Sequence, residues 1–305
     1  MRVISLGSGS SGNALLLEAG PKGRTKILVD AGFNGRTLIE RLRSIGVSPS
    51  QLQGILITHE HSDHILGLPS LVNRHAIPVI TDPRTVTAIE QIVASGYIAV
   101  DADQSGSLEM LADAGNGGNG HCTISQLSQP LSAGSRCMVG DIEVISFPVS
   151  HDAVAPCGYL LSAGGCRVCV AIDSGEVTST MLEAMSQADL LVLESNHDRE
   201  KLLRGPYPYS LKQRILSPTG HLSNDQAADA VLRTWRGDGV RWLWLSHLSR
   251  TNNTPKLALN SMRTRLTEAK ANLAQAHISV LPPGMGGVWD STQLWHSPSL
   301  WEMPG

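Results

Sequence analysis

The chain has 305 residues with ordinary apolar and charged fractions, which allow a sizeable core in one large domain or two smaller ones. Its formal net charge of −3 excludes an overall basic footprint for nucleic acid but leaves room for local basic patches. The N-terminus has no apolar signal segment, and no stretch approaches the ~18 apolar residues of a membrane span, so we expect a soluble cytoplasmic protein without a membrane partner.

The first third of the chain alternates between short apolar runs and segments with helical spacing. The apolar runs predict strands, while Gly46 is a helix stop and the pair Asp82-Pro83 a helix start. Such alternation is typical of a layered α/β fold. Strands are expected over 3–6, 14–18, 26–30, 55–57 and 78–81, and helices over 37–45, 68–75 and 83–95.

A cluster of metal-binding residue types follows the strand that ends at residue 57. Three imidazoles and the carboxylate of Asp63 lie within six residues, with the spacing His-x-His-x-Asp-His. His59 and His61 alternate as residues leaving a strand do, while Asp63 and His64 point elsewhere and can serve a second metal ion. Imidazole and carboxylate without thiolate suit zinc, manganese or iron. A polar turn rarely acquires this spacing by chance.

The segment from about 101 to 136 differs in composition from the rest of the chain. Residues 115–120 consist only of glycine and asparagine, which cannot pack a core. We therefore expect a flexible insertion or surface loop within a single domain spanning residues 1–305, rather than a linker between two domains.

The cysteines are five in number and scattered, which indicates a reducing compartment. The pair Cys166-x-x-Cys169 admits two interpretations: a metal or redox motif, or part of one strand over 166–172 whose two thiols face opposite sides. The apolar run through this pair favours the strand.

The second half of the chain again predicts strands followed by helices. Ser223 is placed to cap the helix expected over 225–236, and Thr254-Pro255 begins a last long helix. No short repeat is present, and the two halves are compatible with a sandwich of two sheets between helices. Strands are expected over 142–145, 159–162, 168–172, 190–193, 240–245 and 278–281.

Six of the eleven histidines, together with Asp173, lie in short polar patches just after a predicted strand or turn. Ligands of α/β proteins bind at the carboxyl ends of strands, so side chains from distant parts of the sequence can meet there. Each such histidine taken alone fits an ordinary surface residue, but together with the first cluster they predict one site. The residues concerned are His59, His61, His64, His151, Asp173, His221 and His247.

The order of these residues resembles the five motifs of the metallo-β-lactamase superfamily over essentially the whole chain. The resemblance implies a four-layered αβ/βα sandwich with two divalent metal ions, which are zinc, manganese or iron. It further implies that Asp173 bridges the two ions and that Asp30 orients the first cluster by hydrogen bonding. By the same resemblance, His59, His61 and His151 hold one ion, and Asp63, His64 and His247 hold the other.

Further motifs are similar to the phosphodiesterase branch that includes tRNase Z. A carboxylate at position 173 suits phosphodiester hydrolysis by two metals, although glyoxalase-type hydrolases also carry aspartate there. The motif around Gly220-His221 resembles the extra histidine of that branch, which implies that His221 donates to the scissile phosphate. The alternative is a helix-terminal histidine that only bonds to the backbone. Asp63 is the candidate acceptor for the proton of the attacking water.

Four shorter motifs look like those of the YycJ/WalJ group of bacterial metallo-hydrolases. This resemblance implies a DNA 5′-to-3′ exonuclease that uses a metal-activated water. The alternatives are a phosphodiesterase of small cyclic phosphates, like PhnP, and a metal-binding scaffold without turnover. The motifs lie at 10–13, 194–198, 205–208 and 248–253.

Substrate contacts are expected from two segments. The glycine-rich turn with Ser10, Ser11 and Asn13 either exposes a cradle of backbone amides to a terminal phosphate or simply needs these residues to turn tightly. His197 either lines the pocket or orders its own loop. Cations around Tyr207 and Tyr209 suit nucleic-acid contact, but solvated helix charges explain them equally well. They are Lys201, Arg204, Lys212 and Arg214. Homodimers are common among proteins that this chain resembles.

Overall fold

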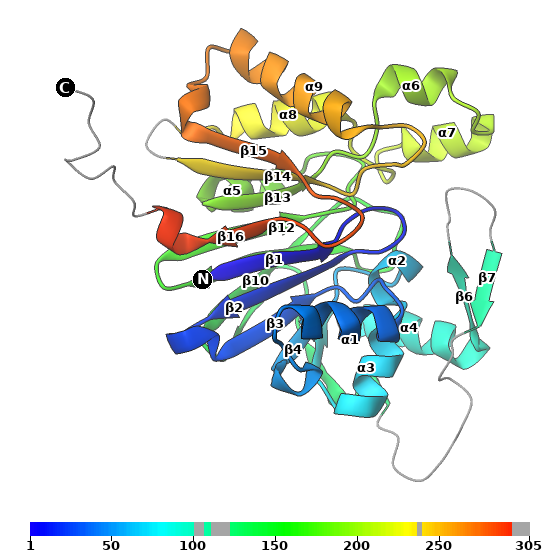
Figure 1. Cartoon of the computed structure of the whole chain (residues 1–305). Helices are drawn as coiled ribbons and strands as arrows, with labels where there is room; N and C mark the ends of the chain where they lie inside the picture. Colours follow the sequence, from blue (N-terminus) through cyan, green and yellow to red (C-terminus); the bar gives the residue numbers. More distant parts are fainter. Residues whose placement is uncertain (101–106, 111–122, 237–239, 295–305) are drawn as a thin grey trace.

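The computed structural model describes residues 1–100, 107–110, 123–236 and 240–294. Two mixed β-sheets pack face to face, and helices cover the outer face of each sheet (Figure 1). The four-layered αβ/βα sandwich expected from the sequence is thereby confirmed. The described residues include no helix long and apolar enough to cross a membrane.

The first sheet contains both antiparallel and parallel strands. Its central strands β3 and β4 are parallel, so their carboxyl ends reach the same edge. Its strands, in spatial order, are β16 (Val288–Asp290), β1 (Arg2–Gly7), β2 (Ala14–Ala19), β3 (Thr25–Val29), β4 (Gly54–Leu56), β5 (Val79–Thr81) and β8 (Ser128–Pro130).

The second sheet has a parallel half and an antiparallel half. Strands β12 to β15 run parallel, so their carboxyl ends also share one edge. In spatial order the strands are β15 (Ala276–Val280), β14 (Arg241–Ser246), β13 (Leu190–Glu194), β12 (Cys166–Ala171), β11 (Cys157–Ala163), β10 (Ile142–Pro148) and β9 (Arg136–Val139). A separate hairpin pairs β6 (Tyr97–Val100) with β7 (Ser107–Met110).

The helices begin where the sequence places capping residues. The side chain of Ser223 accepts from the N–H of Gln226 in a capping box, and Thr254 and Asp82 cap helices whose first residue is proline. The helices are α1 (Gly35–Ser44), α2 (Ser62–Ile65), α3 (Leu68–His75), α4 (Pro83–Ser95), α5 (Ser179–Gln187), α6 (Arg199–Arg204), α7 (Tyr209–Ile215), α8 (Asn224–Arg233) and α9 (Pro255–Glu268).

Three apolar clusters hold the four layers together. One lies between the sheets and includes Leu17 and Tyr159, both fully buried. A second packs the first sheet against α1 and α3, and a third packs the second sheet against α5, α8 and α9. The buried strands therefore have apolar side chains on both faces, which explains why they appear in the sequence as continuous apolar runs rather than as alternating patterns.

Several elements differ from the sequence-based expectation. The helix expected over 225–236 ends at Arg233, where Thr234 is its C-cap. The sequence did not predict β16, which adds Trp289 to the core by pairing with β1. Within the segment 101–136, β8 extends the first sheet, and Leu131 is buried. The Gly/Asn-rich run at 115–120 lies outside the described residues, so the proposed insertion there and the single-domain assignment stay predictions.

The Cys166-x-x-Cys169 pair belongs to one strand, as the apolar run indicates. Cys166 is buried in the cluster between the sheets, whereas Cys169 is buried on the helix-covered face of the same sheet. The two thiols therefore face opposite sides of the sheet, which excludes a disulfide or a shared metal ion. Burial raises the pKa of Cys169 to about 12 and that of Cys157 to about 11.

This burial predicts that Cys157 and Cys169 resist alkylation in the native protein. Because the thiolate is the nucleophile and both groups need local opening to reach solvent, iodoacetamide at pH 8 should modify them roughly a hundredfold or more slowly than in denaturant. Peptide mass mapping over time measures the two rates, with half-buried Cys137 as the internal comparison. Equal rates at Cys169 in native and denatured protein would contradict the placement of this strand.

Candidate active site

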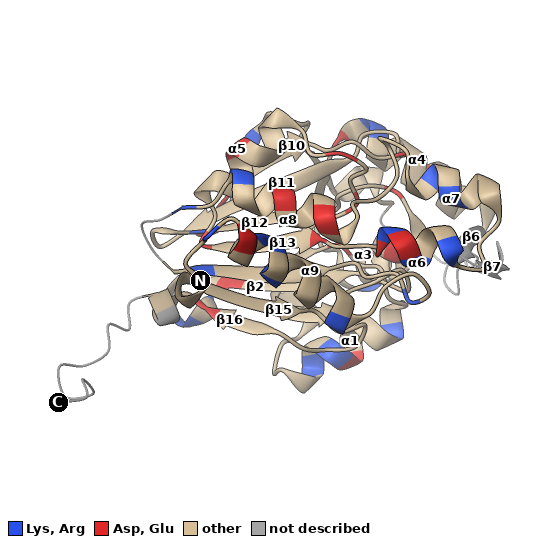
Figure 2. Ribbon diagram, turned by 90° about the horizontal axis from the view of Figure 1, so that it is seen from above, with Lys and Arg blue, Asp and Glu red and all other residues tan. Residues whose placement is uncertain are grey.

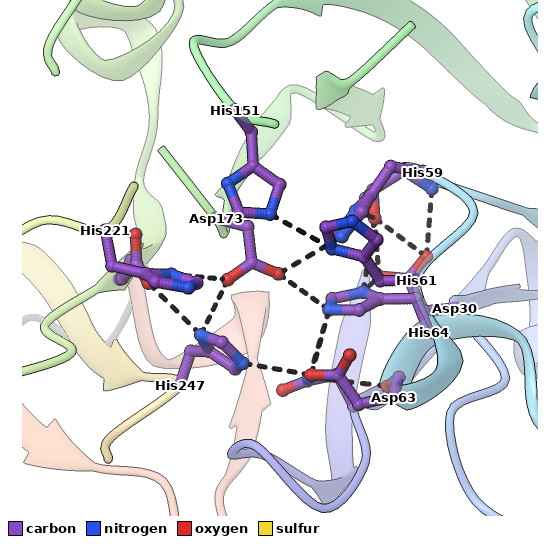
Figure 3. A network of polar contacts seen from close by, with 12 residues as sticks. Asp30, His59, His61, Asp63, His64, His151, Asp173, His221 and His247 are labelled. Carbon is purple, nitrogen blue, oxygen red and sulfur yellow. Dashed lines mark hydrogen bonds and ion pairs between the residues drawn. The ribbon is translucent and has the colours of Figure 1, made fainter. Parts of the chain in front are cut away.

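The strand ends of the two sheets meet at one edge of the sandwich. Strands β3 and β4 are followed by Asp30 and by the segment His59–His64, and strands β12 and β14 are followed by Asp173 and His247. His151 follows β10 and comes from the loop between β10 and β11. Figure 3 shows that these side chains converge from both sheets. The structure therefore brings together the residues that the sequence predicted to converge, which are 59–64, 151, 173 and 247.

Three of these residues have a left-handed backbone conformation directly at the strand ends. The φ angles are 61° for Asp30, 59° for Asp173 and 53° for His247. Aspartate and histidine tolerate this conformation better than branched or bulky residues do, but it still costs free energy. The sharp change of direction lets the chain end a buried strand and turn its polar side chain toward the site at once.

One group of potential metal ligands consists of His59, His61 and His151, whose ligand atoms lie within 4.8 Å of one another. Nε2 of His59 is buried and has no hydrogen-bond partner, which is costly unless an ion occupies the position. Nδ1 of His151 lies 3.0 Å from the carbonyl oxygen of Gly220, which leaves its Nε2 to face His61. This geometry fits the expected ligand set for one divalent ion.

A second group consists of Asp63, His64, Asp173 and His247, again within 4.8 Å. Nε2 of His64 lies 2.7 Å from Oδ2 of Asp173, and Nε2 of His247 lies 3.1 Å from Oδ2 of Asp63. The same Asp173 oxygen lies 3.7 Å from Nε2 of His59. Asp173 thus contacts both groups, which is the placement that a bridging carboxylate needs (Figure 3).

Asp30 contacts the second group through His64, on the ring nitrogen opposite the one that faces Asp173. Its Oδ2 lies 2.8 Å from Nδ1 of His64, and its Oδ1 accepts from the backbone N–H of Thr58 at 2.9 Å. The hydroxyl of Thr58 lies 3.0 Å from Nδ1 of His59. A carboxylate on the far nitrogen fixes both the tautomer and the orientation of a metal-binding imidazole. The structure gives Asp30 the geometry for the orienting role that the resemblance implies.

His221 lies beside Asp173 and is oriented by Glu194, a residue of the motif at 194–198 that the sequence analysis did not predict as part of the site. Oε1 of Glu194 lies 2.7 Å from Nδ1 of His221 and 3.1 Å from Nδ1 of His247, and Glu194 is fully buried. Glu194 is the last residue of β13, so a polar group at the end of a buried strand was the signal that could have found it. With Asp173, these residues form a third group within metal-binding distance.

The protonation states of these side chains follow from their burial and from each other. Burial lowers the pKa of His59 well below its usual value and that of His151 to about 4. Burial opposes ionisation of Asp173, but His247 and His64 outweigh it and hold the pKa of this carboxyl well below its usual range. The neutral form of His59 and His151 and the ionised form of Asp173 are therefore favoured, and these are the forms that bind divalent cations.

Burial and neighbouring charges also compete in setting the pKa of His221, the imidazole that Glu194 orients. Burial alone would lower the pKa of His221, but the charge of Glu194 and the hydrogen bonds to Asp173 and Glu194 raise it to about 10. The His221 side chain remains 17% exposed while that of Glu194 is closed off. The ring is therefore held by one nitrogen and open toward solvent.

The residues that the sequence predicted to contact substrate differ in how deeply they are buried. Ser10 and Ser11 are half-buried at the rim of the site, where a ligand can reach them. Asn13 is buried and its side chain accepts from the N–H of Gly9, with its amide nitrogen 3.3 Å from Oδ2 of Asp63. His197 is fully buried, and both its ring nitrogens lack a hydrogen-bond partner. Direct contact with substrate is therefore open only to the two serines in this conformation.

The cations around Tyr207 and Tyr209 are mostly engaged within the protein. The Lys212 ammonium donates to the carbonyl oxygens of Leu203 and Gly205, and Arg214 forms an ion pair with Asp152 at 2.6 Å. Lys201 donates to the carbonyl oxygen of Asn253, and Arg204 pairs with Glu200. Figure 2 shows α6 with acidic and basic residues side by side. These contacts favour a structural role, although the Tyr209 side chain is 77% exposed.

A protein-family model described as the beta-lactamase superfamily domain matches residues 25–247. Among solved structures, the fold is similar to the metallo-beta-lactamase fold protein YhfI of Bacillus subtilis. The TM-score is 0.62 at 16% identity, covering 95% of this chain and 99% of the other. A diphosphatase of the PhnP family gives a TM-score of 0.59 at 15% identity, covering 95% and 98%. At this level of identity these structures support the fold alone.

Two curated relatives match over most of their length. Exodeoxyribonuclease WalJ of Streptococcus pneumoniae is 38% identical over 265 residues, which is 87% of each chain. Exodeoxyribonuclease YycJ of Bacillus anthracis is 34% identical over 271 residues, covering 89% of this chain and 91% of the relative. The chain therefore belongs to the metallo-β-lactamase superfamily of metal-dependent hydrolases, in the group that contains WalJ and YycJ.

Proposed function

We propose that this protein is a DNA 5′-to-3′ exonuclease that hydrolyses phosphodiester bonds with two divalent metal ions. The observation that carries the proposal is the pair of ligand groups joined through Asp173, in a chain that matches an exodeoxyribonuclease over 87% of that relative's length. Two adjacent cations suit a phosphodiester because they neutralise a substrate that repels anionic nucleophiles. The cytoplasmic location and a homodimer stay predictions.

The ligand assignment follows the two groups. His59, His61 and His151 would hold one ion; Asp63, His64 and His247 would hold the other; and Asp173 would bridge them. The ligands are nitrogen and carboxylate oxygen, which suit zinc, manganese and iron, and availability decides among these metals. The buried Nε2 of His59 has no hydrogen-bond partner, which supports binding of an ion at the first ligand group.

The ions, when bound, supply an activated water and neutralise charge on the phosphate. The chain contributes proton transfer at two points. The Asp63 side chain is 20% exposed and keeps an oxygen directed at the site, so it accepts the proton of the attacking water. His221, held by Glu194 through Nδ1, presents its other nitrogen to the substrate and donates to the leaving or developing oxyanion.

The orienting role of Asp30 can be tested through metal affinity. Asparagine tolerates a positive φ as aspartate does, so Asp30→Asn keeps the turn and removes the charge and one acceptor oxygen behind His64. The variant should bind zinc or manganese about 10- to 100-fold more weakly by calorimetry of metal-free protein. Asp229→Asn, on α8, serves as the control because this carboxylate pairs with Arg265 away from the site. Equal metal affinity in wild type and Asp30→Asn would contradict the role.

The nuclease activity can be tested with a 5′-phosphorylated DNA duplex labelled at either end. Metal-loaded wild-type protein should release nucleotides stepwise from the 5′ end, and Asp173→Asn should abolish release because the carboxylate that joins the two groups is weakened. A cyclic ribose phosphate is assayed in parallel. Hydrolysis of the cyclic phosphate alone would assign the site to small-molecule chemistry, and no turnover of either substrate would favour the scaffold.

The role of His221 predicts a loss of rate without a loss of metal. In His221→Ala, kcat on the DNA duplex should fall about 10²- to 10⁴-fold, the usual range for a general acid. Metal content by atomic emission should stay at the wild-type value. His277→Ala removes an exposed imidazole stacked on Trp242 and should leave kcat unchanged. A wild-type rate in His221→Ala would rule out the donor role.

A further inference from the structure

Arg250 lies within the motif at 248–253 but received no role from the sequence, and it borders the site. Arg250 follows His247 by three residues in the loop after β14, and its side chain is exposed. Its Nη2 donates to the hydroxyl of Ser11 at 2.6 Å. The two loops also meet closer to the site, where the backbone N–H of His247 donates to the hydroxyl of Ser8 at 2.9 Å. Arg250 and Ser11 thus belong to two loops fixed against each other.

The loop that carries Ser11 is anchored directly on the candidate metal ligands. The backbone N–H of Asn13 donates to the carbonyl oxygen of Asp63 at 2.8 Å, and its side-chain amide lies 3.2 Å from Nε2 of His64. Two residues of extended chain span at most about 7 Å, so Ser11 lies within about that distance of Asn13. A group bound at Ser11 is therefore close to the bond that the site would cleave.

The loop also offers donors that the protein does not use. Within the described residues, the backbone N–H groups of Ser10 and Ser11 donate to no protein acceptor, whereas that of Gly12 donates to the carbonyl oxygen of Gly9. Adjacent free N–H groups in a glycine-rich turn form a concavity that favours anions. The serine hydroxyls lie on the same turn and can donate as well.

Unlike the two arginines Arg204 and Arg214 of α6 and α7, Arg250 has no acidic partner among the residues that the structure describes. Arg214 pairs with Asp152 and Arg204 with Glu200, whereas Arg250 forms no ion pair with any carboxylate among the residues that the structure describes. Its charge is therefore available to an external anion. Nη2 uses one N–H on Ser11, and the remaining N–H groups of the planar guanidinium fit a phosphate better than any single ammonium does.

We propose that Arg250, together with Ser10 and Ser11, binds the terminal 5′-phosphate of the nucleic acid substrate. The proposal rests on the proposed exonuclease function and adds the feature that an end-specific enzyme needs. A terminal phosphate monoester carries about −1.5 to −2 charge near pH 7 and three strong acceptor oxygens, whereas an internal diester carries one charge. A guanidinium without an acidic partner, two hydroxyls and two free amides match the monoester in charge and number of donors.

The test compares two DNA duplexes that differ only in a 5′-phosphate or a 5′-hydroxyl. Wild-type protein should show a higher kcat/KM on the phosphorylated duplex. Arg250→Ala should lower kcat/KM on this substrate about 10- to 100-fold, as loss of a charge-assisted hydrogen bond does, and should change the hydroxyl substrate less than about threefold. Arg250→Lys should retain an intermediate preference, since the charge stays and the planar fork is lost.

The control is Arg263→Ala, which removes one exposed positive charge from α9 and should leave both substrates unchanged. Equal losses on the phosphorylated and hydroxyl duplexes in Arg250→Ala would overturn the proposal, because that result describes contact with internal phosphates. An unaltered preference in Arg250→Ala would overturn it as well. Circular dichroism verifies that each variant is folded.

A binding measurement separates this proposal from the proposed function. Fluorescence anisotropy with a nuclease-resistant phosphorothioate oligonucleotide, with and without a 5′-phosphate, needs no turnover. Failure of the wild-type protein to degrade either duplex would reject the exonuclease, whereas the oligonucleotide still reports on Arg250. Tighter binding of the 5′-phosphorylated form by wild type, lost in Arg250→Ala, supports the subsite. Equal binding of both forms by the wild type rejects it.

Discussion

The contact on which the rest of the site depends is the carboxylate of Asp173 between the two ligand groups. It lies 2.7 Å from His64 and 2.6 Å from His247, and it faces His59 at 3.7 Å. Buried ionisable groups cost several kcal/mol each unless they are paired or bind a metal ion. Six imidazoles and four carboxylates share this largely buried volume, where the carboxylates of Asp30, Asp63, Asp173 and Glu194 each lie beside imidazoles. A metal ion that binds here takes the place of protons on these side chains.

The architecture makes this contact possible by joining two sheets at one edge. Parallel strands deliver their carboxyl ends to the same side, and the two sheets contribute residues 30 and 59–64 on one hand and 173, 194 and 247 on the other. Left-handed turns at Asp30, Asp173 and His247 aim the side chains as soon as each strand ends. The rigid sheets hold these three residues in the strained conformation, because a packed core cannot relax to release the strain.

The charge distribution explains how a mildly acidic protein can act on nucleic acid. Its formal charge of −3 provides no general attraction, and four cations of α6 and α7 bind carbonyl groups or acids of the protein itself, namely Lys201, Arg204, Lys212 and Arg214. Binding must therefore depend on local groups. The proposed metal ions and the free guanidinium of Arg250 supply positive charge at the site, where the scissile and terminal phosphates would lie. Recognition restricted to a chain end is consistent with such a local arrangement.

The sequence by itself determined the class of fold, most strands and helices, and the residues that form the two ligand groups. Apolar runs, capping residues and polar groups at strand ends are local signals, and the spacing around His59 has few other uses. Only the tertiary structure decided the rest. It placed Glu194 behind His221, buried Asn13 and His197, joined Trp289 to the first strand and brought Arg250 to Ser11. These contacts join residues far apart in the chain, and no local pattern encodes which distant groups will meet when the sheets close. These contacts stabilise the protein only when the layers pack. The sequence therefore indicated which residues carry the chemistry of the site, and the fold decided which residues contact them.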